Sequence, residues 1–138
     1  MNKEFIPYEE ALALKELGFD EPCFGRYYYK ELYPMLNPQS EETELVFEFG
    51  QYIKQTEVTI LAPLYQQAFR WFREECNLLH IINIDLSDNL KDKVYVYSIE
   101  DHLGSIVDRS EEFKTYEEAE LACLKKLIEI VNQNKRDE

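Results

Sequence analysis

Residues 115–131 constrain the fold more than any other part of the sequence. They open with the capping box Thr115-Tyr116-Glu117-Glu118, in which Thr115 and Glu118 each satisfy a backbone N–H that the first helical turn leaves free. The segment therefore predicts a helix with one broad apolar face, which must be buried against another element. The residues that follow, 131–138, are mostly polar and are expected to fray. The apolar positions of the helix are Ala119, Cys123, Leu124, Leu127, Ile128 and Val131.

Three strand patterns precede this helix. Residues 80–86 (HIINIDL) predict one strand, and residues 93–99 (KVYVYSI) predict a second, in which valine and tyrosine alternate between the two faces of a sheet. Asp101-His102-Leu103-Gly104 predicts a hairpin turn, so residues 105–107 are expected to form a short third strand.

A second amphipathic helix is predicted from Pro63, with its apolar pattern continuing to Leu79. The second half of the chain, residues 63–131, therefore has the order α-β-β-β-α, which is also the element order of a double-stranded-RNA-binding domain. The apolar positions of this helix are Leu64, Tyr65, Ala68, Phe69, Phe72, Cys76 and Leu79.

The first half predicts a short helix that begins at Pro7 and is closed by Gly18. Strands are predicted at 23–29, 45–49 and 57–61. The expected fold class is α+β, with three main helices packed on one or two antiparallel sheets. Because no flexible or charged linker separates the halves, we expect a single domain, residues 1–138.

Acidity argues against several classes of partner. The formal net charge is −13, with −7 on residues 1–61 and −6 on residues 62–138. Such a chain repels phosphate backbones and anionic membranes, so no nucleic-acid or membrane partner is expected. The RNA-binding interpretation also fails locally, because Glu117, Glu118 and Glu120 occupy the helix start where basic residues are needed.

Motifs for catalysis, metals and cofactors are missing from the sequence. His80 and His102 are not spaced as a ligand pair, and no C-x-x-C, G-x-S-x-G or phosphate-binding glycine loop occurs. We therefore predict no catalytic residues, no metal and no cofactor. The odd number of widely spaced cysteines favours buried thiols over disulfides. With no signal core and no membrane-length apolar run, a cytoplasmic location is predicted.

Two groups of residues are candidate contact surfaces. The first is Gln67, Arg70, Trp71 and Arg73, because Trp and Arg dominate binding hot spots. The alternative is internal, with the arginines paired to nearby acids and Trp71 at the edge of the core.

The second candidate surface is the tyrosine run 27–29, together with Tyr33. Alternation along a strand places Tyr28 on one sheet face and the Tyr27/Tyr29 pair on the other. One face can belong to the core, and the other would expose aromatic surface suited to a protein partner or a homodimer.

Segments 5–25, 60–75 and 111–131 (FIPYEEALALKELGFDEPCFG, ILAPLYQQAFRWFREE and EEFKTYEEAELACLKKLIEIV) carry a family resemblance. The chain resembles small uncharacterised proteins of Bacteroidota and of their phages and mobile elements. The resemblance implies a phage or prophage origin and no particular activity.

These observations favour a non-enzymatic protein-interaction module acting on a host protein. A small-molecule binding protein, with Arg70 and Arg73 in a nucleotide-type pocket, is the first alternative. A small enzyme of unknown class is the second.

Overall fold

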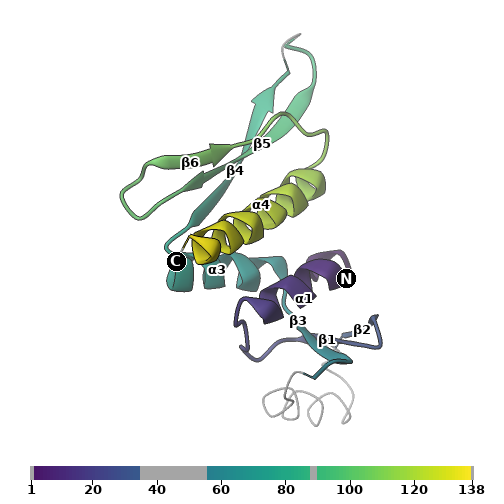
Figure 1. Cartoon of the computed structure of the whole chain (residues 1–138). Coiled ribbons are helices and arrows are strands. Elements are labelled where there is room, and N and C mark those ends of the chain that lie inside the picture. Colours follow the sequence, from purple (N-terminus) through teal and green to yellow (C-terminus); the bar gives the residue numbers. More distant parts are fainter. Residues whose placement is uncertain (1, 35–55, 88–89, 138) are drawn as a thin grey trace. The chain divides into compact units, whose positions relative to one another are not determined.

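The computed structural model describes residues 2–34, 56–87 and 90–137. Contacts divide the chain into two compact units, residues 1–68 and 69–138. Each unit contains a three-stranded antiparallel sheet, and the described residues include three α-helices, so the predicted α+β class is confirmed (Figure 1). The extent of the domain, 1–138, stays a prediction. The units are described separately below.

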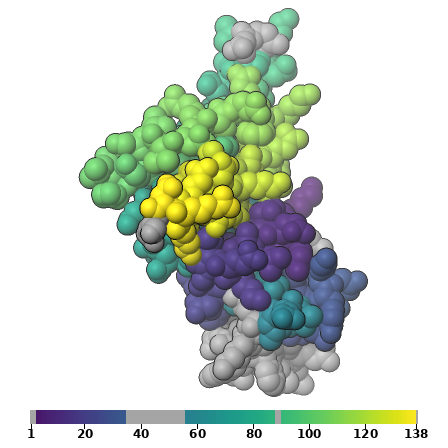
Figure 2. Space-filling view, in the orientation of Figure 1, coloured from purple at the N-terminus to yellow at the C-terminus, as the bar shows by residue number. Residues whose placement is uncertain are grey.

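The first unit contains a 3₁₀ turn, one complete helix and one sheet with the strand order β2-β1-β3. The helix α1 packs against β3. In Figure 2 the purple α1 lies beside the teal β3 strand. The elements are the 3₁₀ turn Asn2–Glu4, α1 (Tyr8–Glu16), β1 (Gly25–Tyr28), β2 (Glu31–Pro34) and β3 (Thr59–Ala62).

The boundaries of α1 follow local rules. Pro7 is the N-cap, one residue before the helix, close to the predicted start. At the other end Gly18 has φ 103°, its N–H donates to the Lys15 carbonyl, and the N–H of Phe19 donates to the Leu14 carbonyl. This is the paired bonding of a Schellman motif, with Phe19 and Leu14 both buried. The predicted closure of the helix at Gly18 is confirmed.

One face of the first sheet forms the core of this unit. Tyr27 and Ile60 lie opposite each other on β1 and β3 and are both buried. The Tyr27 hydroxyl donates to the Ile6 carbonyl at 2.7 Å, and its ring meets that of Tyr8 edge-on. A Cβ atom added to Gly25 would come within 2.6 Å of the Phe5 ring, so glycine allows Phe5 to pack directly on the strand.

The strand β2 was not predicted. It returns from β1 through a two-residue turn, Tyr29-Lys30, whose residues lack the Asn or Gly that usually signals such a turn. The predicted strands at 23–29 and 57–61 are confirmed with narrower or shifted ends as β1 and β3. The predicted strand at 45–49 lies outside the described residues.

The second unit has the predicted order α-β-β-β-α. Its sheet has the strand order β4-β5-β6, and α4 packs against β5 and β4. Figure 1 shows α4 lying along one face of this sheet, with the end of the β4–β5 hairpin reaching past the start of the helix. The elements are α3 (Tyr65–Cys76, in this unit from Phe69), β4 (Leu79–Leu86), β5 (Lys93–Glu100), β6 (Ile106–Arg109) and α4 (Tyr116–Arg136).

The face of β5 that carries Tyr95, Tyr97 and Ile99 lies toward α4. Tyr95 meets the α4 residue Tyr116 edge-on, and the Tyr97 hydroxyl donates to the Asp108 carboxylate at 2.9 Å. Val94 and Val96 lie on the other face, as the alternation predicts. The start of α4 is also as predicted, because the Thr115 side chain accepts a hydrogen bond from the Glu118 N–H. The buried residues of α4 are Ala119, Cys123, Leu124, Leu127, Ile128, Ile130 and Val131.

The predicted limits of the helix from Pro63 are wrong. The helix from Pro63 begins at Tyr65 and ends at Cys76 instead of Leu79, because Asn77 adopts a left-handed φ of 56° and the next residues enter β4. The helix α4 continues to Arg136, and Lys135 and Arg136 in its last turn interact favourably with the helix dipole. The fraying expected for residues 131–138 stays a prediction.

The contact between Gly25 and Phe5 predicts the effect of a single added methyl group. Gly25→Ala is expected to lower the free energy of unfolding by about 1–3 kcal/mol, because the buried Phe5 ring has no room to retreat. Urea unfolding of Gly25→Ala in wild-type and Phe5→Leu backgrounds checks this. The cost is expected to shrink when Phe5 is trimmed. An equal cost in both backgrounds would show that the clash is not the cause.

Candidate functional site

The β1–β2 hairpin exposes three tyrosines, which we call the tyrosine surface: Tyr28, Tyr29 and Tyr33. Their exposed fractions are 41%, 63% and 45%, so each of the three tyrosines presents aromatic surface to solvent. The ring of Tyr28 lies 4.6 Å from that of Tyr29 and 6.5 Å from that of Tyr33, centroid to centroid. The three rings therefore form one contiguous aromatic patch.

The turn that presents these rings is strained. Tyr29 and Lys30 have φ values of 49° and 70°, so both central residues occupy the left-handed region. A non-glycine residue held there costs on the order of 1 kcal/mol. The turn is anchored by the Tyr29 N–H, which donates to the Val58 carbonyl at 3.0 Å. Positive φ at both central residues is what a two-residue hairpin turn requires, and the turn places Tyr29 at the tip of the β1–β2 hairpin.

Arg26 borders the tyrosine surface. It lies opposite Tyr33 in the β1–β2 register, and its guanidinium carbon is 5.9 Å from the Tyr28 ring centroid. Its Nε atom is buried and has no hydrogen-bond partner among the described residues. The surface therefore combines aromatic rings with a cation, the two residue classes most enriched in binding hot spots.

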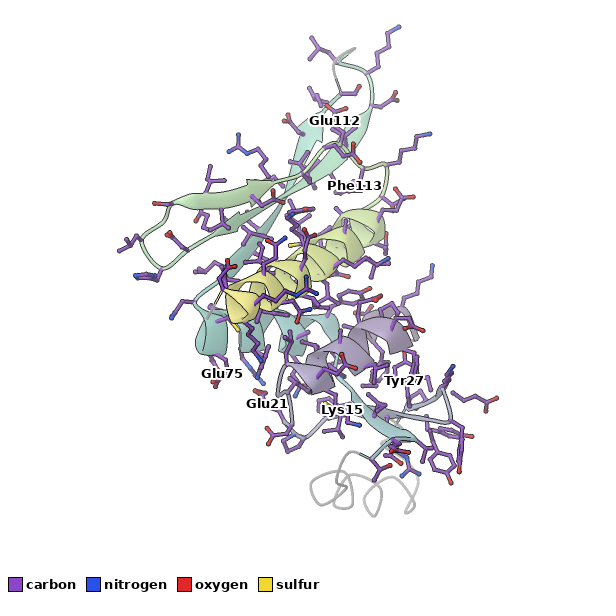
Figure 3. All side chains as sticks on the ribbon, viewed as in Figure 1. Lys15, Glu21, Tyr27, Glu75, Glu112 and Phe113 are labelled. Carbon is purple, nitrogen blue, oxygen red and sulfur yellow. The ribbon has the colours of Figure 1, made fainter. Side chains whose placement is uncertain are left out.

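The structure separates the two tyrosines that the sequence grouped as one candidate. Tyr27 lies in the core beside α1 and offers no exposed ring (Figure 3). Tyr29 sits in the turn instead of on the Tyr27 face, because the strand ends at Tyr28. The exposed partners of Tyr29 are Tyr28 and Tyr33. The alternation of side chains predicted an exposed aromatic face, but it wrongly placed Tyr29 on the same sheet face as Tyr27.

Gln67, Arg70, Trp71 and Arg73, the first candidate contact surface, lie on α3 and have different surroundings. The Gln67 side chain donates to the Pro22 carbonyl at 2.8 Å, and Trp71 is buried with its ring edge-on to Phe72. Arg70 and Arg73 are exposed. Gln67 and Trp71 thus have internal contacts, and for Trp71 this matches the internal alternative. A binding role for the four stays a prediction.

The second unit has a polar depression on the sheet face opposite α4. Its volume is about 480 Å³. Asn83 and Asp85 of β4 approach it from one side and Ser98 and Arg109 from the other. Sequence reasoning missed it, because only the strand register brings these residues together. Arg70 and Arg73, which the sequence suggested for a pocket, do not line it.

Titratable groups in the core are held neutral by burial. Burial, with a contribution from nearby Arg73, lowers the pKa of His80 to about 4, and its ring stacks on Phe69 at 3.7 Å. Burial raises the pKa of the Cys123 thiol to about 12, and it also raises that of Cys23. Thiols in this state are poor nucleophiles.

Neither a metal-binding cluster nor a membrane-spanning helix is found within residues 2–34, 56–87 and 90–137. No group of three or more His, Cys, Asp or Glu side chains there is arranged to hold a metal ion. None of the helices described has the length and apolar character that crossing a bilayer needs. The predicted cytoplasmic location stays a prediction.

Comparison with known proteins adds no relative: no protein-family model, curated protein or solved structure matches this chain.

The depressed pKa of His80 predicts a pH dependence of stability. Between its ordinary value of 6.5 and about 4, the unfolded chain binds a proton at His80 and the folded chain does not. The contribution of His80 is therefore fully present above pH 6.5 and is lost as the pH falls toward 4. His80→Gln is expected to reduce the loss of unfolding free energy between about pH 7 and about pH 5, measured by urea titration.

His102→Gln, at an exposed position, is the matched control for replacing a histidine by glutamine. An imidazole NMR titration that placed His80 near 6.5 in the folded protein would contradict the interpretation.

Proposed function

We propose that this chain is a protein-interaction module and that the tyrosine surface is its contact site. The observation that carries the proposal is the contiguous exposure of Tyr28, Tyr29 and Tyr33 on a strained turn. Tyrosine brings a large, rigid contact area at little cost in side-chain entropy, and it is enriched at the centres of interfaces. The turn is held by the hydrogen bond from the Tyr29 N–H to the Val58 carbonyl, and this reduces the ordering that binding requires.

A protein partner fits this surface better than a nucleic acid. Aromatic platforms that stack bases are accompanied by a basic groove that follows the phosphates. Here the chain carries a net charge of −13, and Glu31 lies next to the tyrosines at the end of the same hairpin. In the second unit, Glu117 and Glu118 occupy the first turn of α4, where an RNA-binding domain of this topology needs cations.

The charge also indicates the kind of protein bound. An acidic molecule attracts partners with basic surfaces, and this raises the rate of encounter. Proteins that themselves bind nucleic acid have such surfaces. The resemblance to small proteins of Bacteroidota and their phages supports a phage or prophage origin and a host protein as the target.

Quantitative affinity capture from Bacteroidota lysate tests the proposal. Proteins that bind the wild type are expected to be lost with Tyr29→Ala and Tyr33→Ala. For a purified partner, calorimetry is expected to show each substitution weakening binding at least about 30-fold, as for hot-spot tyrosines. Leu103→Ala is the matched control, because Leu103 is 77% exposed in the other unit and outside the tyrosine surface. If the control and the tyrosine variants behave alike, the tyrosine surface is not the contact site.

Small-molecule binding is a second candidate function, favoured by the polar depression of the second unit. Asp85 and Arg109 place opposite charges at its rim, and Asn83 and Ser98 add neutral hydrogen-bonding groups. Such a set suits a small polar ligand of the nucleotide type.

A thermal-shift screen with nucleotides checks this second candidate. A ligand at about 100 times its dissociation constant stabilises the fold by about 2.7 kcal/mol. Arg109→Ala is expected to abolish the shift, and Arg136→Ala, at the far end of α4, is expected to preserve it. A shift that persists in Arg109→Ala would place the ligand elsewhere.

A further inference from the structure

The outer edge of β4 is an unprotected strand edge. Among the described residues, β4 pairs with β5 on one side and with no strand on the other. It pairs over eight residues, Leu79 to Leu86, without a bulge. The strand contains no Lys, Arg or Pro, the residues that proteins place on sheet edges to prevent further pairing.

The register of the sheet shows which backbone groups of β4 face outward. Tyr95 exchanges both backbone hydrogen bonds with Phe113, and the Tyr97 carbonyl accepts from the Ser110 N–H. The odd-numbered residues of β5 therefore direct their backbone groups away from β4, and Val94, Val96 and Ser98 direct theirs toward it.

The partners of these three residues on β4 are Asp85, Asn83 and Ile81, whose backbone groups point toward β5. In an antiparallel ladder, the backbone N–H and C=O groups of alternate residues point to opposite sides of the strand. The backbone groups of the β4 residues between these partners therefore point away from β5.

The backbone N–H and C=O groups of His80, Ile82 and Ile84 consequently face the open edge. The side chains of these residues share the face that α4 covers, because they lie opposite Ile99, Tyr97 and Tyr95. Toward the end of the hairpin this face becomes open: Ile84 is 64% exposed and Leu86 is 52% exposed. Figure 2 shows the hairpin extending beyond α4 at the top of the view.

We infer that this edge binds the same edge of a second copy of the chain. Two β4 strands related by a two-fold axis at Asn83 run antiparallel and keep both α4 helices on the same side of a six-stranded sheet. In that register, Ile82 exchanges its two outward backbone hydrogen bonds with Ile84 of the partner subunit. The exposed Ile84 then packs beside the partner subunit's Ile82 on the apolar face.

The distribution of charge on β4 supports self-pairing in this register. Asp85 is the only carboxylate of the strand. With the axis at Asn83, Asp85 lies opposite Ile81 of the partner subunit, so the two Asp85 carboxylates do not face each other. The net charge of −13 opposes association at long range, and salt screens this repulsion. The dimer is therefore expected to strengthen with ionic strength.

Sedimentation velocity of the full chain over a roughly hundredfold concentration range, at low and high salt, tests the inference. A single strand pair is a small interface, so a concentration-dependent equilibrium of monomer and dimer is expected. Ile84→Lys is expected to weaken dimerisation at least tenfold. Ile106→Lys is the matched control, because Ile106 is an exposed isoleucine (53%) on β6, the opposite edge strand.

Amide hydrogen exchange gives a second readout. The Ile82 and Ile84 amides are expected to gain protection as the wild-type concentration rises, and not in Ile84→Lys. A wild type that is monomeric at every concentration, or a dimer that Ile106→Lys disrupts and Ile84→Lys does not, would overturn the inference. Tyr29→Ala is expected to leave dimerisation unchanged, so this inference and the proposed function can fail separately.

Discussion

The pairing of β4 with β5 is the interaction on which the second unit depends. It runs without interruption over eight residues and fixes which side chains of each strand share a face. One face, with Tyr97 and Ile99, is committed to α4, and the other collects Asn83, Asp85 and Ser98 into a polar depression. The same ladder uses the inward backbone groups of β4 and leaves the outward ones at an open edge. Core, depression and edge are therefore consequences of one register.

A related constraint determines where the tyrosine surface of the first unit lies. Burial of Tyr27 against α1 forces its neighbour Tyr28 to the opposite face, because successive side chains of a strand alternate. The tight turn that follows then places Tyr29 outside the sheet and returns the chain so that Tyr33 stands near Tyr28. The burial of Tyr27 in the core thus determines the position of the tyrosine surface.

Local signals in the sequence were sufficient for the helix ends that depend on a few neighbouring residues. Thr115 and Gly18 act as predicted because a cap is satisfied within one helical turn.

Local sequence signals were insufficient where a tertiary contact overrides the local preference of a residue. Tyr29 and Lys30 adopt left-handed φ values that their residue types disfavour, and β2 was missed for this reason. Leu79 fits the apolar period of the preceding helix, yet it opens β4, where it pairs with Glu100. The polar depression joins residues from three strands, which only a known register can align.

The two proposed surfaces differ in what they require of the chain. The tyrosine surface is built from side chains of one hairpin, so its specificity can change by substitution at a few exposed positions without disturbing the sheet. The β4 edge is built from backbone groups that every residue carries, so its specificity comes from length, register and the absence of Lys, Arg and Pro from the strand. Self-pairing would give each assembly two copies of the tyrosine surface. Where a partner can engage both copies at once, a weak contact gains affinity through effective concentration without any new contact. An acidic chain that associates weakly with itself can in this way bind a basic partner more tightly than one tyrosine surface alone.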